Sequence, residues 1–318
     1  MKRIISVVLI ISMCFSFAAC GAENSQNDDL HSPNNNSESN FSDDYNQDYS
    51  DNDNYNSNYT QNTSPSKHQF KSYRVEGALS PFATNVLNEL ENTDSYCDSA
   101  IQEYQNGFYC SLQMAMIVTM ALDDGTYSDR ISAIVELQET LSSYDNSAVQ
   151  EAVNSTYRLV EMLETLAYEI DINNLHTTKI RAVYDYLNAM DEQCESAPQQ
   201  LANAMYRSVE LLTIIATMLD DGSYSNYIEL YTTEFDYLEQ FCDSAPQQSA
   251  VASYKIVQFL SIIAKELDYN NAYTNKIDAI LEYQKQVDNL CDSAPQQVSN
   301  NSYRTTEMLG VIVNILDS

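Results

Sequence analysis

The sequence is poor in the residues on which most enzyme active sites and nucleic-acid interfaces depend. It has three histidines, no tryptophan, and 15 lysines and arginines against 46 aspartates and glutamates, for a net charge of -31. Nucleic-acid phosphates need a basic surface, so we expect no nucleic-acid partner. The same charge disfavours docking on anionic lipid and favours either simple solubility or a basic partner.

Glycine and proline are also scarce, with six of each in 318 residues. The alternation of polar and apolar residues that is typical of half-buried strands is absent as well. A hydrophobic fraction of 44% is nevertheless enough to build a core. Few chain-breaking residues and no strand pattern together indicate a mainly helical protein.

Motifs of known catalytic chemistry do not occur. There is no His-Glu-x-x-His, no Gly-x-Ser-x-Gly, no phosphate-binding glycine loop and no dinucleotide fingerprint. We therefore predict a non-enzymatic protein with no catalytic residue, no cofactor and no metal ligand. A hydrolase that uses paired carboxylates on a cell-wall or glycan substrate stays open as an alternative, because the sequence cannot sort 46 acids into pairs.

The first twenty residues have the organisation of a secretion signal. Lys2 and Arg3 precede an apolar stretch, Ile4 to Phe17, that is too short for an ordinary transmembrane helix. The stretch ends Phe-Ala-Ala-Cys-Gly, with the cysteine at position 20. This ending resembles the lipobox of bacterial lipoproteins. The resemblance implies that residues 1–19 are a signal peptide and that Cys20 carries acyl chains such as palmitate, which anchor the protein to the cell membrane, outside the cytoplasm.

A polar segment follows, from residue 20 to residue 77. It consists mainly of Asn, Ser, Asp, Gln and Tyr, with hardly an aliphatic residue. Such a segment cannot bury enough apolar surface to offset its conformational entropy, so we predict a disordered linker. The linker would hold the folded domain, predicted for residues 78–318, away from the lipid surface.

The rest of the chain is a tandem repeat marked by the phrase Cys-Asp-Ser-Ala-Pro-Gln-Gln. Complete copies begin at Cys242 and Cys291, a nearly identical copy at Cys194, and weaker copies at Cys97 and Asp145. The starts are 48, 49, 48 and 49 residues apart, and a fixed period of this size indicates a repeat architecture. Each phrase has the features of a helix start: its serine and the glutamine three residues later form a capping box, and proline falls in the first turn.

Each repeat contains two helices with apolar residues at helical spacing. The helix after the phrase is about 22 residues long and ends at Asp-Asp-Gly or Asp-x-Asn-Asn, where glycine or asparagine tolerates a left-handed C-cap. A second helix leads into the next phrase, and the first of these begins at Pro81. We predict an all-α fold in which five tandem antiparallel hairpins form an α-solenoid-like array. Antiparallel helix bundles are the alternative.

Four cysteines hold the same place in the repeat, namely Cys97, Cys194, Cys242 and Cys291, and Cys110 is the fifth in the predicted domain. Equivalent residues in stacked repeats lie about 10 Å apart, too far for a disulfide. We expect free thiols that are buried where one helix turns into the next.

One tyrosine recurs at the same place in the long helix of all five repeats, and a basic residue follows it in four. In a stacked array these residues would form a ladder, and Tyr and Arg are favoured as interface anchors. The predicted binding residues are Tyr109, Tyr157, Arg158, Tyr206, Arg207, Tyr254, Lys255, Tyr303 and Arg304. The alternative is that each tyrosine packs beside the apolar stripe and bonds a neighbouring repeat.

The Asp-Asp-Gly turns at Asp123 and Asp220 offer a further alternative, a calcium-responsive surface module with Asp129 or Asn226 as an extra oxygen ligand. The spacing is not that of an EF-hand. This mismatch favours a simpler interpretation, an acidic helix end closed by glycine. Our main hypothesis is a lipid-anchored extracytoplasmic helical-repeat protein that acts as a protein- or peptide-binding or scaffold module.

Overall fold

The computed structural model describes residues 80–142, 144 and 147–317, and the predicted signal peptide, Cys20 and linker lie outside them. Within this part of the chain there are ten α-helices and no strand, which confirms the predicted all-α fold. Five short helices alternate with five long ones. The short helices are α2 (Pro81–Asp94), α4 (Ser128–Ser142), α6 (Thr177–Asp191), α8 (Ser225–Glu239) and α10 (Thr274–Asp288). The long helices are α3 (Ala100–Leu122), α5 (Ala148–Ile170), α7 (Ala197–Leu219), α9 (Ala245–Leu267) and α11 (Ala294–Asp317).

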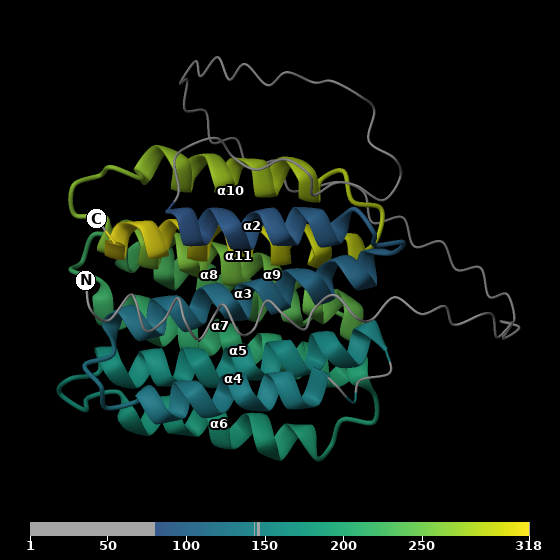
Figure 1. Cartoon of the computed structure of the whole chain (residues 1–318), viewed down its shortest axis with the longest axis horizontal. Helices are drawn as coiled ribbons and strands as arrows, with labels where there is room; N and C mark the ends of the chain where they lie inside the picture. The colour runs from purple at the N-terminus through teal and green to yellow at the C-terminus, as the bar shows by residue number, and fades with distance from the viewer. Residues whose placement is uncertain (1–79, 143, 145–146, 318) are drawn as a thin grey trace, which may run out of the picture. The chain divides into compact units, whose positions relative to one another are not determined.

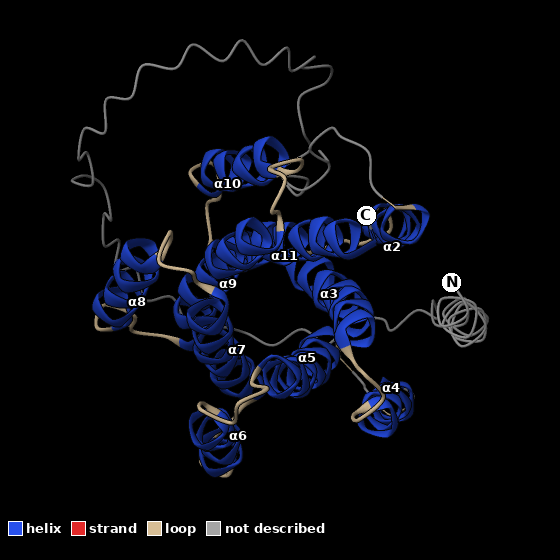
Figure 2. Cartoon of the chain, turned by 90° about the vertical axis from the view of Figure 1, so that its left-hand side faces the viewer, coloured by secondary structure: helices blue, strands red, loops and turns tan. Residues whose placement is uncertain are grey.

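The long helices form a closed inner ring. They pack side by side in the order α3, α5, α7, α9 and α11, and α11 packs in turn against α3. Figure 2 shows this ring end-on, with the short helices set around its outside. Figure 1 shows the same helices from the side, where they run nearly parallel to one common direction. The predicted array of hairpins is therefore present, and it closes on itself.

Each short helix packs on two neighbouring long helices, and α2 completes the cycle by packing on both α3 and α11. In the described residues no two short helices contact each other. The difference in burial is large, because α7 buries twelve residues whereas α8 buries only Phe235. The apolar stripe of each long helix thus builds the core, and the short helices keep much of their surface in solvent.

The seam that closes the ring, between α3 and α11, is tight and polar. A Cβ built on Gly107 would lie 2.2 Å from Ser302 Oγ, so the two helices approach closely at this point. Nearby, the hydroxyls of Ser111 and Thr306 share a hydrogen bond of 2.8 Å. Small side chains permit the approach, and the buried hydroxyls satisfy each other.

The start of the described chain is tied to the same seam. The backbone N–H of Ser80 donates to Asn314 Oδ1 of α11, and the Tyr303 hydroxyl donates to Glu91 of α2 over 2.6 Å. The beginning of the first helix therefore lies beside the last helix, and contacts between residues more than 200 positions apart hold the ring closed.

One aspartate organises each turn from a long helix to the following short helix. In the second repeat Asp171 is the C-cap of α5, and its carboxylate accepts the backbone N–H groups of Leu175 and His176 at 2.8 and 3.1 Å. It also accepts the Thr177 hydroxyl at 2.7 Å. The same carboxylate thus ends one helix and satisfies free N–H groups at the start of the next. The equivalent residues are Asp123, Asp220 and Asp268.

The predicted left-handed residues are present, but they lie inside these turns and not at the helix caps. The φ angles are 108° for Gly125, 105° for Gly222, 55° for Asn174 and 52° for Asn271. The glycine turn needs one residue fewer than the asparagine turn between the aspartate and the next helix. The two turn types alternate along the chain, which explains why the repeat steps alternate between 48 and 49 residues.

The other turn, from short to long helix, is formed by the seven-residue phrase. As predicted, its first glutamine reaches back, so that Gln247 Oε1 accepts the backbone N–H of Asp243 at 2.9 Å. The serine half of the capping box is present at Ser99 and Ser147, where Oγ accepts the N–H three residues later. At Ser244 no such bond forms, and the hydroxyl lies 3.2 Å from Gln247 Oε1. The capping box is thus complete in some copies and one-sided in others.

Candidate binding surface and pocket

The predicted ladder of tyrosines lies between long and short helices. Tyr206 and Tyr303 are buried, and the other three tyrosines are partly buried. Each side chain with a defined contact turns toward the short helix of the next repeat: Tyr157 donates to Asp191 of α6, and the Tyr206 ring packs on Phe235 of α8 with centroids 4.8 Å apart. The Tyr157 contact is the hydrogen bond of the packing alternative, whereas Tyr206 contacts the neighbouring repeat through its ring alone. A role of the ladder in binding a partner stays a prediction.

In three repeats the basic residue after the tyrosine, namely Arg207, Lys255 or Arg304, turns toward the short helix of its own repeat, whereas Arg158 pairs with Glu161 of its own helix. The Arg207 guanidinium lies 4.6 Å from the centre of the Tyr186 ring, and Lys255 Nζ lies 2.6 Å from the Glu234 carboxylate. Tyr186 and Glu234 occupy the same position in α6 and α8. The short helix therefore supplies an aromatic face to an arginine and an acid to a lysine, which matches the chemistry of each cation.

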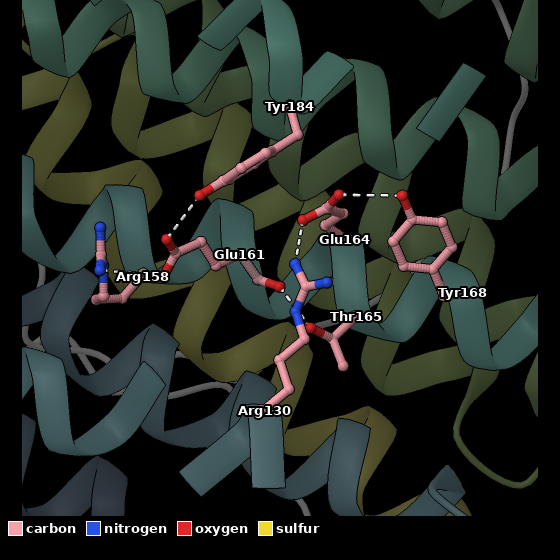
Figure 3. Close-up of polar contacts among 7 residues, drawn as sticks. All are labelled: Arg130, Arg158, Glu161, Glu164, Thr165, Tyr168 and Tyr184. Carbon is pink, nitrogen blue, oxygen red and sulfur yellow. Dashed lines mark hydrogen bonds and ion pairs between the residues drawn. The ribbon is translucent and has the colours of Figure 1, made fainter. Parts of the chain in front are cut away.

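A network of charged and hydroxyl side chains joins α4, α5 and α6 (Figure 3). Its first half surrounds Glu161, which pairs with Arg158 at 3.1 Å and accepts a hydrogen bond from Tyr184 at 3.0 Å. Burial raises the pKa of Tyr184 to about 12, and the charge and the hydrogen bond of Glu161 add to this effect. Tyr184 therefore stays protonated and donates.

The second half of this network surrounds Glu164, which is 3% exposed. Arg130 of α4 pairs with its carboxylate, and the Tyr168 hydroxyl donates to it at 3.2 Å. Burial raises the pKa of Glu164, while Arg130 opposes that rise. Glu161 and Glu164 are neighbouring acids of the kind that a hydrolase needs, but each is engaged by an arginine and a tyrosine, and neither lines the pocket described below.

Two groups of three carboxylates lie at the glycine turns, each with one oxygen per residue within 4.8 Å of the others. Asp129, one of the two predicted extra ligands, belongs to neither group. The third carboxylate comes instead from the next long helix, which the sequence alone does not place. The groups are Asp123, Asp124 and Glu169, and the equivalent Asp220, Asp221 and Glu266.

The glutamate of each group has an unusual pKa. Burial, followed by the hydrogen bond and charge of Asp123, raises the pKa of Glu169 to about 7. Burial and the charge of Asp221 raise the pKa of Glu266 to about 7 in the same way. A carboxyl group that holds its proton near neutral pH can donate to its aspartate neighbour, so a shared proton accounts for the close approach.

The five cysteines of the domain are free thiols. Cys110 is buried, whereas the four cysteines of the phrase are partly exposed, so the expectation that they are buried is wrong. In the last two copies the thiol donates to a carbonyl in the final turn of the short helix, from Cys242 to Leu238 and from Cys291 to Val287. The thiol therefore helps to satisfy the free carbonyls at that helix end.

Sequence reasoning also missed a recurring asparagine seven residues after the serine of the phrase. Asn106, Asn203 and Asn300 each donate a side-chain N–H to a backbone carbonyl of the short helix in their own repeat, at 3.1, 3.1 and 3.3 Å. The bond fastens the two helices of a hairpin together. Its repetition at a fixed offset was a visible signal.

A pocket of about 260 Å³ lies between α6, α7 and α8, close to the turn made by the third phrase. It combines aromatic, amide, charged and thiol side chains. The residues that line it are Tyr186, Met190, Gln193, Cys194, Gln199, Ala202, Asn203, Tyr206, Arg207, Glu239 and Gln248.

Comparison with known proteins gives no relative for this chain: no family model, no curated protein and no solved structure matches it. Over the described residues, none of the helices has the length and apolar character needed to cross a membrane.

Proposed function

We propose that this protein is a non-enzymatic helical-repeat module that binds a partner protein or peptide and is held outside the cytoplasm by a lipid on Cys20. The anchor rests on the N-terminal segment, whose charged start, short apolar stretch and Ala-Ala-Cys ending resemble those of bacterial lipoproteins. The binding role rests on the surface of α8.

One face of α8 exposes large apolar side chains. Tyr227, Leu230 and Tyr237 of α8 and Phe241, in the turn that follows it, are 45–52% exposed. The spacing of three and seven residues places the first three along one side of the helix. The rings of Tyr237 and Phe241 contact each other, with centroids 4.9 Å apart. Exposed aromatic and aliphatic side chains along one side of a helix are typical of a recognition site. This exposed face is the observation that carries the proposal.

The closed ring supports an outer site. An open array presents the concave side of its long helices to a partner. Here the long helices are covered on both flanks by one another, so the short helices form the accessible surface. A net charge of -31 favours a partner whose rim around the apolar contact is basic.

The binding proposal can be tested by cross-linking on intact bacteria that produce the full-length chain, followed by recovery of the cross-linked protein. We expect a partner that the double variant Tyr227→Ser/Tyr237→Ser fails to capture. The matched control is Ile172→Ser/Tyr269→Ser, which removes two exposed apolar side chains at turns and should capture the partner normally. Failure to recover any protein above a control consisting of residues 1–77 alone would count against the proposal.

The anchor is tested separately by metabolic labelling with a palmitate analogue. We expect the wild-type chain to carry the label and to sediment with membranes, and Cys20→Ser to lose both properties. Label that persists in Cys20→Ser would refute the proposed lipid site.

A further inference from the structure

The pocket between α6, α7 and α8 lies where the repeat loses one of its internal hydrogen-bond networks. One repeat earlier, Asp191 closes the equivalent place. Its carboxylate accepts both the Tyr157 hydroxyl, at 2.5 Å, and the Gln200 amide, at 2.9 Å. The side chains of Tyr157, Asp191 and Gln200 thus satisfy one another's hydrogen bonds.

In the next repeat the acid is Glu239, one methylene longer than Asp191, and this network is not made. The Tyr206 side chain is 7% exposed, and its hydroxyl has no hydrogen-bond partner among the described residues. The side chains of Glu239 and Gln248 likewise form no hydrogen bond within the described chain, and all three residues line the pocket. Of the three, Tyr206 is buried, so its hydroxyl is the group that needs a partner, while Gln248 is partly exposed and Glu239 is exposed, which leaves both side chains accessible to a ligand.

The other side of the pocket supplies an aromatic platform and a further donor. Tyr186 is 49% exposed. The guanidinium of Arg207 lies against this ring and pairs with Glu210 at 3.1 Å, but its buried Nε–H has no acceptor. This side of the pocket therefore carries little net charge, because Arg207 is paired with Glu210, but the Arg207 Nε–H still lacks an acceptor.

We propose that this pocket binds one ring of a neutral carbohydrate. A hydroxyl is both donor and acceptor, so neighbouring sugar hydroxyls can donate to Glu239 and accept from Gln248 and from Arg207. The C–H face of a sugar ring carries partial positive charge and suits the electron-rich face of Tyr186. Burial, and then the charge of Glu239, raise the pKa of the Tyr206 hydroxyl, so that it is a donor at every physiological pH.

Charged ligands fit less well. An ammonium or guanidinium group has no acceptor to offer to the Arg207 Nε–H. A carboxylate would satisfy Arg207 but would lie against Glu239 on a chain of net charge -31. The volume, about 260 Å³, is below the range of roughly 300–1,000 Å³ that is usual for drug-sized ligands and fits a single ring. Because Glu239 is the one carboxylate that lines the pocket, the site has the chemistry for binding but not the acid pair for hydrolysis.

Cys194 offers a local readout because it lines the pocket and its thiol is partly exposed. The full-length chain would be alkylated with iodoacetamide at about pH 8.5, since burial and the nearby Asp191 raise the pKa of this thiol. The probes are glucose, galactose, mannose and N-acetylglucosamine, each up to about 50 mM, because a one-ring ligand binds weakly. Mass spectrometry would follow the rate at Cys194, with Cys97, the equivalent thiol of another repeat, as internal control.

We expect at least one of these sugars to slow alkylation of Cys194 saturably, by about threefold at twice its dissociation constant, with no change at Cys97. Glu239→Asp, which restores the acid found in the preceding repeat, should close the pocket and abolish the protection without unfolding the chain. Glu229→Asp, at an exposed position on α8, is the matched control and should leave it intact.

The inference fails if none of the four sugars protects Cys194, or if protection survives unchanged in Glu239→Asp. It also fails if lysine or glucuronate protects Cys194 as well as the best sugar does. None of these results bears on the partner proposed for the α8 face, because that test reads the capture of a protein and uses residues outside the pocket.

Discussion

Gly107 of α3 lies directly against Ser302 of α11, and this contact sets how closely the first and last long helices approach. An alanine Cβ at position 107 would lie 2.2 Å from Ser302 Oγ and 2.7 Å from Ser302 Cβ, so the helices must separate. We expect Gly107→Ala to lower the free energy of unfolding by about 1–3 kcal/mol, measured by urea denaturation.

A matched control is the other helical glycine, Gly310. A Cβ there would lie 3.3 Å from the flexible end of Met114, so Gly310→Ala should be neutral or stabilising because alanine favours the helix. Adding Ser302→Gly to Gly107→Ala should recover part of the loss, as a favourable coupling in a double-mutant cycle. Equal effects of the two alanine variants would contradict close packing at the seam.

Two equivalent tyrosines should respond differently to loss of the hydroxyl. Tyr157 donates to Asp191, so we expect Tyr157→Phe to cost about 1–2 kcal/mol. The buried Tyr206 hydroxyl has no partner among the described residues, so Tyr206→Phe should be neutral or stabilising. Thermal or urea unfolding of the two variants checks this, and an equal loss in both would show that the two sites are bonded alike.

The turn aspartates should matter far more than the exposed residues beside them. Asp171 accepts three hydrogen bonds that start α6, so Asp171→Ala should destabilise the protein by about 1–2 kcal/mol. Ile172, its neighbour in the chain, is 83% exposed, and Ile172→Ala should change stability by less than about 0.5 kcal/mol. The experiment is equilibrium unfolding of both variants. A similar loss in the two would mean that the turn is not organised by the carboxylate.

Stability should depend on pH through Glu169 and Glu266, whose pKa values are raised to about 7 by burial and by neighbouring aspartates. The folded state binds these protons more tightly than the unfolded chain, whose glutamate pKa is near 4.5. Their stabilising contribution is therefore complete below about pH 4.5 and is lost as the pH rises through about 7.

A glutamine imitates the protonated acid at every pH. We expect Glu169→Gln/Glu266→Gln to match the wild type near pH 4.5 and to exceed its stability at pH 8 by about 1–2 kcal/mol per site, after allowance for solvent screening. The control is Glu229→Gln on the exposed side of α8. A stability difference that stays constant between these pH values would argue against the shared proton.

Much of the fold could be predicted because it depends on contacts between residues that are close in the sequence. The capping glutamine of four phrases contacts a residue four positions away. The apolar spacing of each helix defines its buried face without reference to the rest of the chain. Helix starts, helix ends and the count of hairpins depend on such short-range patterns.

Closure of the ring could not be predicted in this way. It depends on the angle between successive hairpins, which is set by side-chain packing such as that of Gly107 on Ser302, 195 residues apart. The same limit applies to the candidate sites. Glu169 of α5 lies close to Asp123, the C-cap of α3, and the sequence does not show that these two residues are neighbours. The pocket lies where Glu239 replaces the aspartate of the preceding repeat, and the sequence does not show that Tyr206 and Gln248 surround this residue.

The alternation of the two turn types has a consequence for symmetry. Two turn types cannot alternate all the way around a ring that has an odd number of long helices, and here there are five. The carboxylate groups accordingly couple α3 with α5 and α7 with α9, while α11 stands between the two pairs. The ring therefore lacks fivefold equivalence. A partner that binds the α8 face, or a sugar that binds the pocket, should therefore bind with a stoichiometry of one per chain.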